Sequence, residues 1–440
     1  MNNQASIHSI LTEVDWDPVD AAVAAEAETA FRFLERLVGA PSTVGREQIA
    51  QDIVAEELTR LGFRTEPLTV PDFIAADPAA GVPQGPYERR YNVLGRLAAG
   101  PGPVLLLNGH IDVVPAETGP WSSAPYAATR TDGWLVGRGA GDMKGGFAMG
   151  TLAIAALARA MPDALAVSPL WFLSVIEEEC TGNGTLAAAR QGVLGDAVVL
   201  LEPSGLDLLL GGVGILWIDI EIAGRAAHAE SADRAVNPVQ AAFAIVQALG
   251  AFEHAMNAEE KDPALAAVAH PYNVNVGTMR AGDWRSSVPP TAQLGVRIGF
   301  PRSWSPDEAL RRVREVVAEA ARDDAWLREH PPVVHPTGFR AEGYLLAEDH
   351  PLAEALAAAH ADAHGVPPKR VVLGSTTDAR FYLNQFGCPA IAYGPRTRNI
   401  HGVDEAVELA SIVEGARTLA RFIASWALSG GLLDLKAGRA

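Results

Sequence analysis

The stretch that decides the fold is VLLLNGHIDVVP, Val104–Pro115, in which an uninterrupted apolar run ends in a histidine and an aspartate two residues apart. A short, continuous run of leucine and valine is typical of a strand that is buried on both faces of a sheet. His110 and Asp112 stand where this strand ends. Because ligands bind at the carboxyl ends of the strands in open α/β sheets, the stretch predicts a buried strand with a polar site at its end.

Three further apolar runs repeat this arrangement. Each leads into acidic residues or a histidine: PLWFLSVI (169–176) into Glu177, Glu178 and Glu179, AVVLL (197–201) into Glu202, and PAIAY (389–393), through a short loop, into His401. Helical patterns separate the runs, which is typical of a parallel or mixed sheet that is covered by helices on both faces. Imidazoles and carboxylates at one edge of a sheet are potential zinc ligands, so the pattern predicts a metal site.

Two local features add to this site. The segment GRGAGDMKGGFAMG, residues 137–150, surrounds Asp142 with glycines, which let backbone pass close to a metal cluster while Asp142 points into it. Residues i and i+2 of an extended chain point the same way. We therefore expect Asp112 to accept the imidazole N–H of His110 that does not face the metal, which would fix the tautomer of that ring.

The middle of the chain has a different pattern. ILWIDIEIAG alternates apolar and polar residues, as a strand with one exposed face does, and it is followed by a long helix, two more strand-like runs and a second helix. The sequence therefore predicts an α/β protein with a mixed, mostly parallel sheet flanked by helices and an inserted α+β domain. The catalytic, metal-binding domain is expected at 1–211 and 331–440, and the insertion at 212–330.

Composition limits the classes of function. The chain has 440 residues, and its 35 lysines and arginines against 53 aspartates and glutamates give a net charge of −18. This balance argues against a nucleic acid or an anionic membrane as partner, and no apolar run is long enough for a membrane span. The two cysteines cannot form a disulfide framework, and no signal-peptide pattern is present, so we expect a cytoplasmic protein.

Taken together, these motifs resemble one family. His110-x-Asp112, the glycine-rich GAGDMKGG, the acidic run after a strand, EPS at 202–204 and IH at 400–401 are similar to those of the acetylornithine deacetylase, succinyl-diaminopimelate desuccinylase and aminoacylase family. Carboxypeptidase G-type enzymes and dipeptidases are similar as well. The resemblance spans nearly the whole chain, and it implies a dinuclear zinc amidohydrolase with a zinc-peptidase-like catalytic domain and a ferredoxin-like lid or dimerisation domain.

The resemblance also implies roles for the metal-site residues. His110 would bind one zinc ion and His401 the other, Asp142 would bridge both and precede a cis peptide bond, and Glu202 would complete the first zinc site. Cobalt or manganese can substitute for zinc in such sites. The acidic run leaves two registers open: Glu178 as general base with Glu179 as ligand, or Glu177 as base with Glu178 as ligand.

Substrate-side residues are implied in the same way. His228, in GRAAHAES, matches a histidine that stabilises the oxyanion from the partner subunit of a homodimer, formed through the strand ILWIDIEI or the helix of the inserted domain. Arg297 and Arg380 are candidates for binding a substrate carboxylate. Two positions depart from the family pattern, because Gly295 stands where an aspartate is usual and Ser286 where an asparagine is common.

The function expected from the sequence is hydrolysis of the amide bond of an N-acyl amino acid or a related small carboxylate by water activated at two metal ions. A dipeptidase or carboxypeptidase that acts on short peptides with the same site is the alternative. A catalytically inactive binding protein would have lost a ligand or the base, and the sequence retains all of them.

Overall fold

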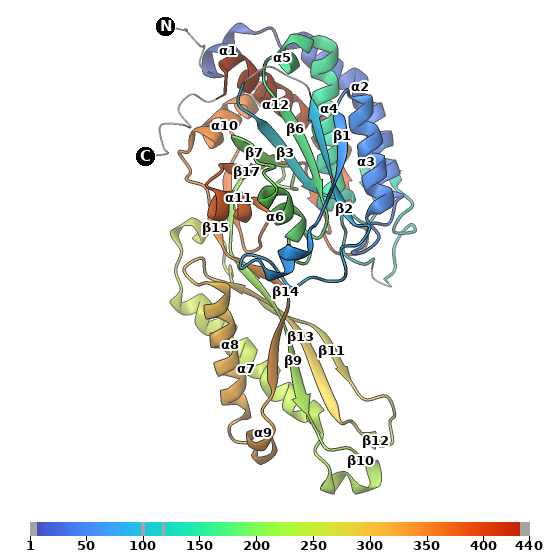
Figure 1. Ribbon diagram of the computed structural model, residues 1–440, viewed down its shortest axis with the longest axis vertical. Helices are drawn as coiled ribbons and strands as arrows, with labels where there is room; N and C mark the ends of the chain where they lie inside the picture. Colours follow the sequence, from blue (N-terminus) through green and yellow to red (C-terminus); the bar gives the residue numbers. More distant parts are fainter. Residues whose placement is uncertain (1–6, 98–101, 117–118, 432–440) are drawn as a thin grey trace.

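The computed structural model describes residues 7–97, 102–116 and 119–431, so both ends of the predicted catalytic domain, 1–6 and 432–440, lie outside the described residues. Figure 1 shows two lobes: a large one that contains the first and last described helices, α1 (Ile7–Glu13) and α12 (Leu409–Ser429), and a slender one that projects from it. Within the described segments, no helix combines the length and the apolar character that a bilayer crossing requires.

A mixed sheet forms the centre of the large lobe, with the strand order β1-β2-β6-β3-β7-β17-β8-β15, and β16 pairs with β8. The strands are β1 (Arg64–Thr69), β2 (Tyr91–Leu97), β3 (Leu105–His110), β6 (Leu170–Val175), β7 (Ala197–Leu200), β8 (Leu208–Gly212), β15 (Tyr344–Leu345), β16 (Arg370–Leu373) and β17 (Ala390–Ala392). The four central strands β6, β3, β7 and β17 are parallel, whereas the strands toward both edges include antiparallel pairs. The predicted α/β class is therefore confirmed.

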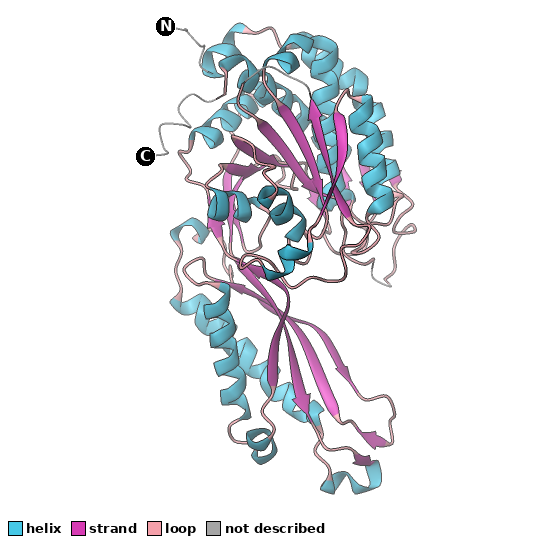
Figure 2. Ribbon diagram, viewed as in Figure 1, coloured by secondary structure: helices cyan, strands magenta, loops and turns pink. Residues whose placement is uncertain are grey.

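Helices cover both faces of this sheet (Figure 2). Every residue of β3 is buried: Leu105 and Leu107 pack into one apolar cluster, and Leu106 packs into another on the opposite face. The helices of the large lobe are α1 (Ile7–Glu13), α2 (Asp17–Val38), α3 (Gln48–Arg60), α4 (Gly145–Ala160), α5 (Pro162–Val167), α6 (Asn183–Arg190), α10 (Pro351–His364), α11 (Ala379–Phe386) and α12 (Leu409–Ser429). Burial of each such leucine contributes about 1.5–3 kcal/mol, which explains why a run without polar residues forms this strand.

A small sheet in the large lobe brings distant loops together. It has the order β18-β19-β5-β4, formed by β4 (Thr129–Thr131), β5 (Trp134–Val136), β18 (Thr397–Arg398) and β19 (Ala406–Glu408). The pairing of β19 with β5 places the loop after β5, which leads to Asp142, beside the loop between β18 and β19, which carries His401.

The slender lobe, which we call the lid, is a four-stranded antiparallel sheet with two helices on one face. In chain order its main elements are β9 (Gly214–Ala223), α7 (Pro238–Glu259), β11 (Val274–Ala281), β13 (Thr291–Phe300), α8 (Pro306–Ala321) and β14 (Val333–Ala341). This βαββαβ order is ferredoxin-like, as expected. The alternating pattern of β9 buries Ile218 and Ile220 beneath the helices and leaves Trp217 and Asp219 on the open face.

Two details of the lid differ from the sequence prediction. Strand β14 pairs with β9, so the lid sheet extends to Ala341, beyond the predicted boundary at 330. The segment VVHPTGFRA had no strand pattern because Pro336 interrupts it, and a register shift follows that proline. Strand β9 lies between β13 and β14, so both of its edges are already paired, whereas β11 is an edge strand.

Candidate metal centre

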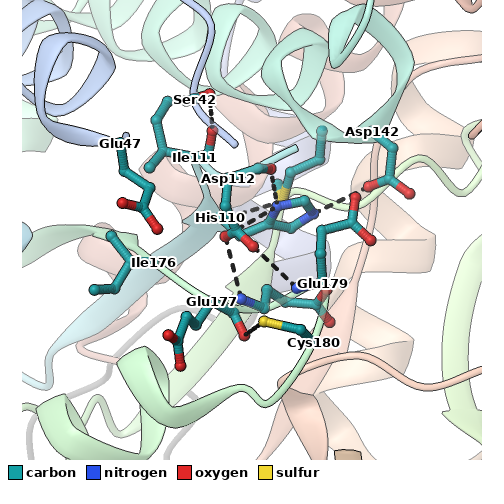
Figure 3. Close-up of polar contacts among 12 residues, drawn as sticks. Ser42, Glu47, His110, Ile111, Asp112, Asp142, Ile176, Glu177, Glu179 and Cys180 are labelled. Carbon is teal, nitrogen blue, oxygen red and sulfur yellow. Dashed lines mark hydrogen bonds and ion pairs between the residues drawn. The ribbon is translucent and has the colours of Figure 1, made fainter. Parts of the chain in front are cut away.

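Three candidate ligands meet at the carboxyl edge of the large sheet. Nε2 of His110, at the end of β3, lies 3.0 Å from Oδ1 of Asp142. Ligand atoms of His110, Asp142 and Glu179 all lie within 4.8 Å of one another, which is a spacing that could hold a metal ion. Figure 3 shows Asp142 and Glu179 on the same side of the His110 ring. The Asp142–Met143 peptide bond is cis, as the resemblance implied.

The two remaining candidate ligands lie beside this group. Nε2 of His401 is 3.1 Å from the Glu179 carboxylate and 3.5 Å from Oδ2 of Asp142. Oε2 of Glu202, which follows β7, is 3.9 Å from Nε2 of His110. The Asp142 carboxylate therefore faces His110 with one oxygen and His401 with the other, which is the placement required of a group that bridges two ions.

The electrostatics of the cluster indicate an excess of buried negative charge. Burial raises the pKa of the Glu202 carboxyl to about 8 and that of the Glu178 carboxyl well above its usual range. Burial opposes the charge of His110, but its hydrogen bond with Asp142 and the Glu202 and Glu178 charges raise the pKa of its imidazole well above 6.5. Divalent cations would offset the repulsion among these carboxylates, so the donor set fits metal ions of the zinc type.

The position of Asp112 differs from the prediction. Nδ1 of His110 is 2.9 Å from the backbone carbonyl oxygen of Asp112, whereas the Asp112 carboxylate is 3.7 Å away. The carboxylate instead accepts the backbone N–H groups of Glu178 and Glu179, each at 3.1 Å. Strand β3 ends at His110, so the extended geometry assumed for residues i and i+2 does not continue to Asp112. Its side chain therefore fixes the acidic loop, and its main chain orients the imidazole.

Glu177 lies outside the metal cluster. Its carboxylate is fully buried, and it accepts hydrogen bonds from Arg90 Nη1 at 2.6 Å, from the Tyr87 hydroxyl at 2.8 Å and from the Thr181 hydroxyl at 2.8 Å. Arg90 also pairs with Glu47, which is buried as well. Figure 3 shows the Glu177 side chain directed away from His110 and Asp142. Glu178 and Glu179 are therefore the two members of the acidic run at the cluster.

A buried ion pair that the sequence did not predict links the two loops of the site. Glu405 accepts the backbone N–H groups of Gly141 and Asp142 with Oε1, each at 3.0 Å, and Arg138 Nη1 with Oε2 at 2.5 Å. Arg138 also donates to the backbone carbonyl of His401 at 3.2 Å. The side chains of Arg138 and Glu405 are each only 1% exposed to solvent. The sequence offered no signal for this pair, because its members are 267 residues apart.

The predicted substrate-side residues are placed in three different regions. His228 is exposed in β10 (Ala227–His228), which pairs with β12 (Ser287–Val288) at the far tip of the lid, remote from the cluster within one chain (Figure 1). Arg297 lines a groove on the open face of the lid sheet. Arg380 is 2% exposed and donates to the backbone carbonyls of Thr377 and Thr181, so in this structure it braces the segment that follows the acidic run.

The family of the chain follows from comparison with known proteins. A family model described as Peptidase family M20/M25/M40 matches residues 106–425. Succinyl-diaminopimelate desuccinylase from Methylobacterium radiotolerans is 31% identical over 402 residues, which cover 88% of this chain and 93% of that protein. N-formyl-4-amino-5-aminomethyl-2-methylpyrimidine deformylase from Halalkalibacterium halodurans is 26% identical over 341 residues, covering 73% and 79%.

Solved structures agree on the fold. Human carnosine dipeptidase 1 superimposes with a TM-score of 0.74 at 16% identity, covering 94% of this chain and 100% of that one. The dipeptidase Dug1p from Saccharomyces cerevisiae has a TM-score of 0.74 at 14% identity, covering 96% and 99%. The resemblance inferred from the motifs is confirmed by the family match and the desuccinylase relative. The chain belongs to peptidase family M20/M25/M40, and it is an amidohydrolase of that family.

Proposed function

We propose that this amidohydrolase cleaves the amide bond of an N-acyl amino acid or a related small carboxylate, with two zinc ions at the cluster. The observation that carries the proposal is the convergence of His110, Asp142, Glu179, Glu202 and His401 at one edge of the sheet. The desuccinylase and deformylase names of the relatives support an acyl group as the part released.

The five ligand candidates divide into two sets around Asp142. His110 and Glu202 would hold one ion, His401 and Glu179 the other, and Asp142 would contact both. Two such cations, when bound, lower the pKa of a water molecule and polarise an amide carbonyl. Cobalt or manganese would serve the same purpose, since carboxylate and imidazole donors accept all three metals.

Glu178 is the proposed general base. It is 7% exposed at the cluster, and burial raises the pKa of its carboxyl, so it can take a proton from the attacking water and pass it to the leaving amine. The Asp112 carboxylate holds the Glu178 backbone in place. The Glu177 carboxylate already accepts hydrogen bonds from Arg90, Tyr87 and Thr181. This argues against the register in which Glu177 is the base.

The oxyanion that develops on the cleaved carbonyl needs a further donor, and we propose His228 of the partner subunit of a homodimer. Within one chain His228 lies at the lid tip, so only a second copy or a large lid movement could bring it to the ions. The lid offers the edge strand β11 and the exposed Phe243 of α7 for an interface between copies. Strand β9 is no candidate for edge pairing, because both of its edges are occupied.

A substrate panel tests the proposal. N-acetyl, N-formyl and N-succinyl amino acids and dipeptides would be assayed with the protein loaded with zinc, cobalt or manganese. Release of the acyl acid without peptide cleavage is the expected result. Release of amino acids from the dipeptides would favour the dipeptidase or carboxypeptidase alternative, and no hydrolysis with any metal would overturn the proposal.

A pair of isosteric substitutions tests the identity of the base. Glu178→Gln is expected to reduce kcat by about 10²–10⁴-fold while both ions stay bound, because the group that moves the proton is lost. Glu177→Gln keeps the metal ligands and the base. If the Glu177 substitution alone abolishes turnover in a folded protein with bound metal, the other register holds.

A further inference from the structure

The connection between β1 and β2 contacts both lobes of the molecule. Its residues 81–87, GVPQGPY, which we call the strap, lie beside β14 of the lid (Figure 1). Pro83 and Pro86 fix the backbone φ angle at two positions of this short segment. Because the strap is short and constrained, a displacement of one part of it is carried to the rest.

The middle of the strap binds an irregular part of the lid sheet. The pairing of β14 with β9 has a register shift between residues 336 and 340, so β9 pairs with neither Thr337 nor Gly338. The Val82 backbone N–H donates to the Gly338 carbonyl at 2.8 Å. The Gln84 side-chain amide donates to the Thr337 carbonyl at 2.5 Å. The strap thus supplies the hydrogen-bond partners that the lid sheet lacks there.

Both ends of the strap bind the segment that follows the acidic run. Asn183, the first residue of α6, is fully buried. Its Oδ1 accepts the Gly81 N–H at 3.0 Å, and its Nδ2 donates to the Gly81 carbonyl at 3.1 Å and to the Tyr87 hydroxyl at 2.8 Å. The Tyr87 hydroxyl in turn donates to Oε2 of Glu177 at 2.8 Å. A continuous chain of hydrogen bonds therefore joins the strap to the acidic run.

The lid, the strap and the acidic run are in direct contact at Gly81. A Cβ atom at this position would lie 2.8 Å from the carbonyl oxygen of Gly338 and 2.8 Å from the Cβ atom of Thr181. No free space separates the three segments, and close-packed groups transmit a displacement to one another. A movement of Gly338 with the lid therefore has to move the strap, Thr181 or both.

The conformation of Glu177 depends on its side-chain contacts. Its φ angle is +63°, in the left-handed region that a residue with a side chain seldom adopts. Its carbonyl closes a tight turn by accepting the N–H groups of Thr181 and Gly182 at 3.0 and 2.7 Å. Such a conformation persists only where the surroundings hold it. Loss of the Tyr87 contact would weaken this hold, and the adjacent Glu178 would shift with the turn.

We propose that Tyr87 and Asn183 are positioning residues that connect the loop of Glu178 to the return strand of the lid through the strap. The proposed base is then aligned with the ions while the strap holds Gly338. A lid movement that breaks this contact also displaces the base. The inference rests on the proposed function, in which Glu178 moves the proton.

Tyr87→Phe tests the centre of this connection, because it removes the hydroxyl and keeps the ring. At saturating metal, kcat and kcat/KM are expected to fall together by about ten- to hundredfold, since a misplaced base slows the chemical step. Tyr91→Phe is the matched control, because the Tyr91 hydroxyl donates to the exposed Asp52 of α3 at 2.6 Å. It should keep the wild-type kcat. A Tyr87 variant with the wild-type kcat would overturn the proposal.

Hydrogen exchange tests the connection without any substrate. Gln84→Ala removes an exposed side chain of the strap and its bond to the lid. The backbone amides of Glu178 and Glu179, which donate to Asp112, are expected to exchange about two- to tenfold faster in this variant, the factor that one lost hydrogen bond corresponds to. In a Tyr87→Phe background the same substitution should have no further effect, because the connection is already broken.

Asn257→Ala controls for a general loosening of the lid. Asn257 bonds to the main chain of Glu253 and of Tyr272 within the lid. Its loss should leave the exchange of the two acidic-run amides unchanged. Unchanged exchange in Gln84→Ala, or an equal increase in the Tyr87→Phe background, would overturn the connection even where amide hydrolysis stands. If no amide is cleaved by the wild-type protein, the proposed function fails, and the exchange rates alone decide whether the strap connects the lid to the acidic run.

Discussion

The Glu405 carboxylate links its own loop, which also carries His401, to the loop that carries Asp142, although it is not itself a ligand candidate. One of its oxygens accepts two backbone N–H groups at Gly141 and Asp142, and the other pairs with Arg138, which in turn contacts the main chain of His401. Such supporting contacts orient metal ligands, and they are worth about 10–100-fold in metal affinity where they have been removed.

Glu405→Gln is therefore expected to weaken metal binding by about 10–100-fold. The amide oxygen can still accept the two backbone N–H groups, but Arg138 loses its buried charge partner. Titration of the metal-free protein with zinc or cobalt, followed by calorimetry, measures the change. Asp362→Asn is the control, because it removes a carboxylate from a different ion pair, that of Arg421. Equal affinity in the two variants would contradict the role given to Glu405.

Single residues could be predicted where their chemistry follows directly from a strand. His110, Glu202 and the acidic run stand at the ends of buried apolar runs, so their convergence follows from the parallel order of the strands. The partners of Glu177 and Glu405 could not be predicted. They depend on contacts with Arg90 and Arg138, which are far away in sequence and which only the folded chain brings near.

Helix α4 begins directly after the segment that carries Asp142, and it packs closely against the end of β7. It begins at Gly145, and a Cβ atom on Gly146 would lie 1.9 Å from the carbonyl oxygen of Leu201, the residue before Glu202. Only glycine lets the helix and the end of β7 lie this close. Gly146 of the GDMKGG segment is therefore explained by the close packing of two elements that each adjoin a ligand candidate.

Gly146→Ala tests this packing. We expect a loss of about 1–3 kcal/mol in the free energy of unfolding, because a methyl group has to push the helix away from the Leu201 main chain. Gly250→Ala is the matched control in α7, where no atom lies within 4 Å of the added Cβ. It should stabilise the protein by about 0.5–1 kcal/mol through helix propensity. Denaturant unfolding measures both, and a neutral Gly146 variant would contradict the close approach.

Helix α10 contains a pH-sensitive pair, His360 and His364. Burial and the neighbouring His364 lower the pKa of His360 from 6.5 to about 4, and its Nδ1 lies 2.9 Å from the Tyr393 hydroxyl. Because the folded state favours the neutral ring, the contribution of His360 to the free energy of unfolding should be fully present above pH 6.5 and should be lost as the pH drops toward 4. His360→Gln is expected to flatten this part of the curve of melting temperature against pH. Identical curves would contradict the assignment.

The sequence predicted some secondary-structure elements and missed others. The central strands are continuous apolar runs, which are typical of a sheet covered on both faces. The sequence therefore predicted that these strands are buried. Strand β14 was missed because a proline and a glycine interrupt its pattern, and its pairing is irregular at the same place. The place of β9 in the middle of the lid sheet depends on that missed strand.

The residues proposed for the chemistry lie in two lobes that one chain does not bring together. The candidate ligands and Glu178 belong to the large lobe, whereas His228 lies at the tip of the lid (Figure 1). A homodimer in which each lid serves the other subunit would resolve this separation. In such an assembly neither copy is a complete catalyst alone.

Mixing two inactive variants tests this arrangement. Glu178→Gln removes the proposed base and His228→Ala removes the proposed oxyanion donor, so each homodimer should be strongly impaired. After subunit exchange, about half of the dimers combine both variants and have one intact site, which restores about a quarter of the wild-type activity. Recovery measured against protein concentration checks the prediction. No recovery, in a mixture shown to contain mixed dimers, would place both groups in one chain.

The chain enters and leaves the lid at almost a single point. Strand β9 begins at Gly214 and β14 ends at Ala341, and Ile215 pairs directly with Ala341, so the outgoing and returning chain are neighbours about 5 Å apart. An inserted segment that is attached in this way can become longer, become shorter or be exchanged without a change in the strand order of the sheet that carries the candidate ligands. Changes in the inserted segment can therefore alter which substrates fit without moving the strands that carry the candidate metal ligands.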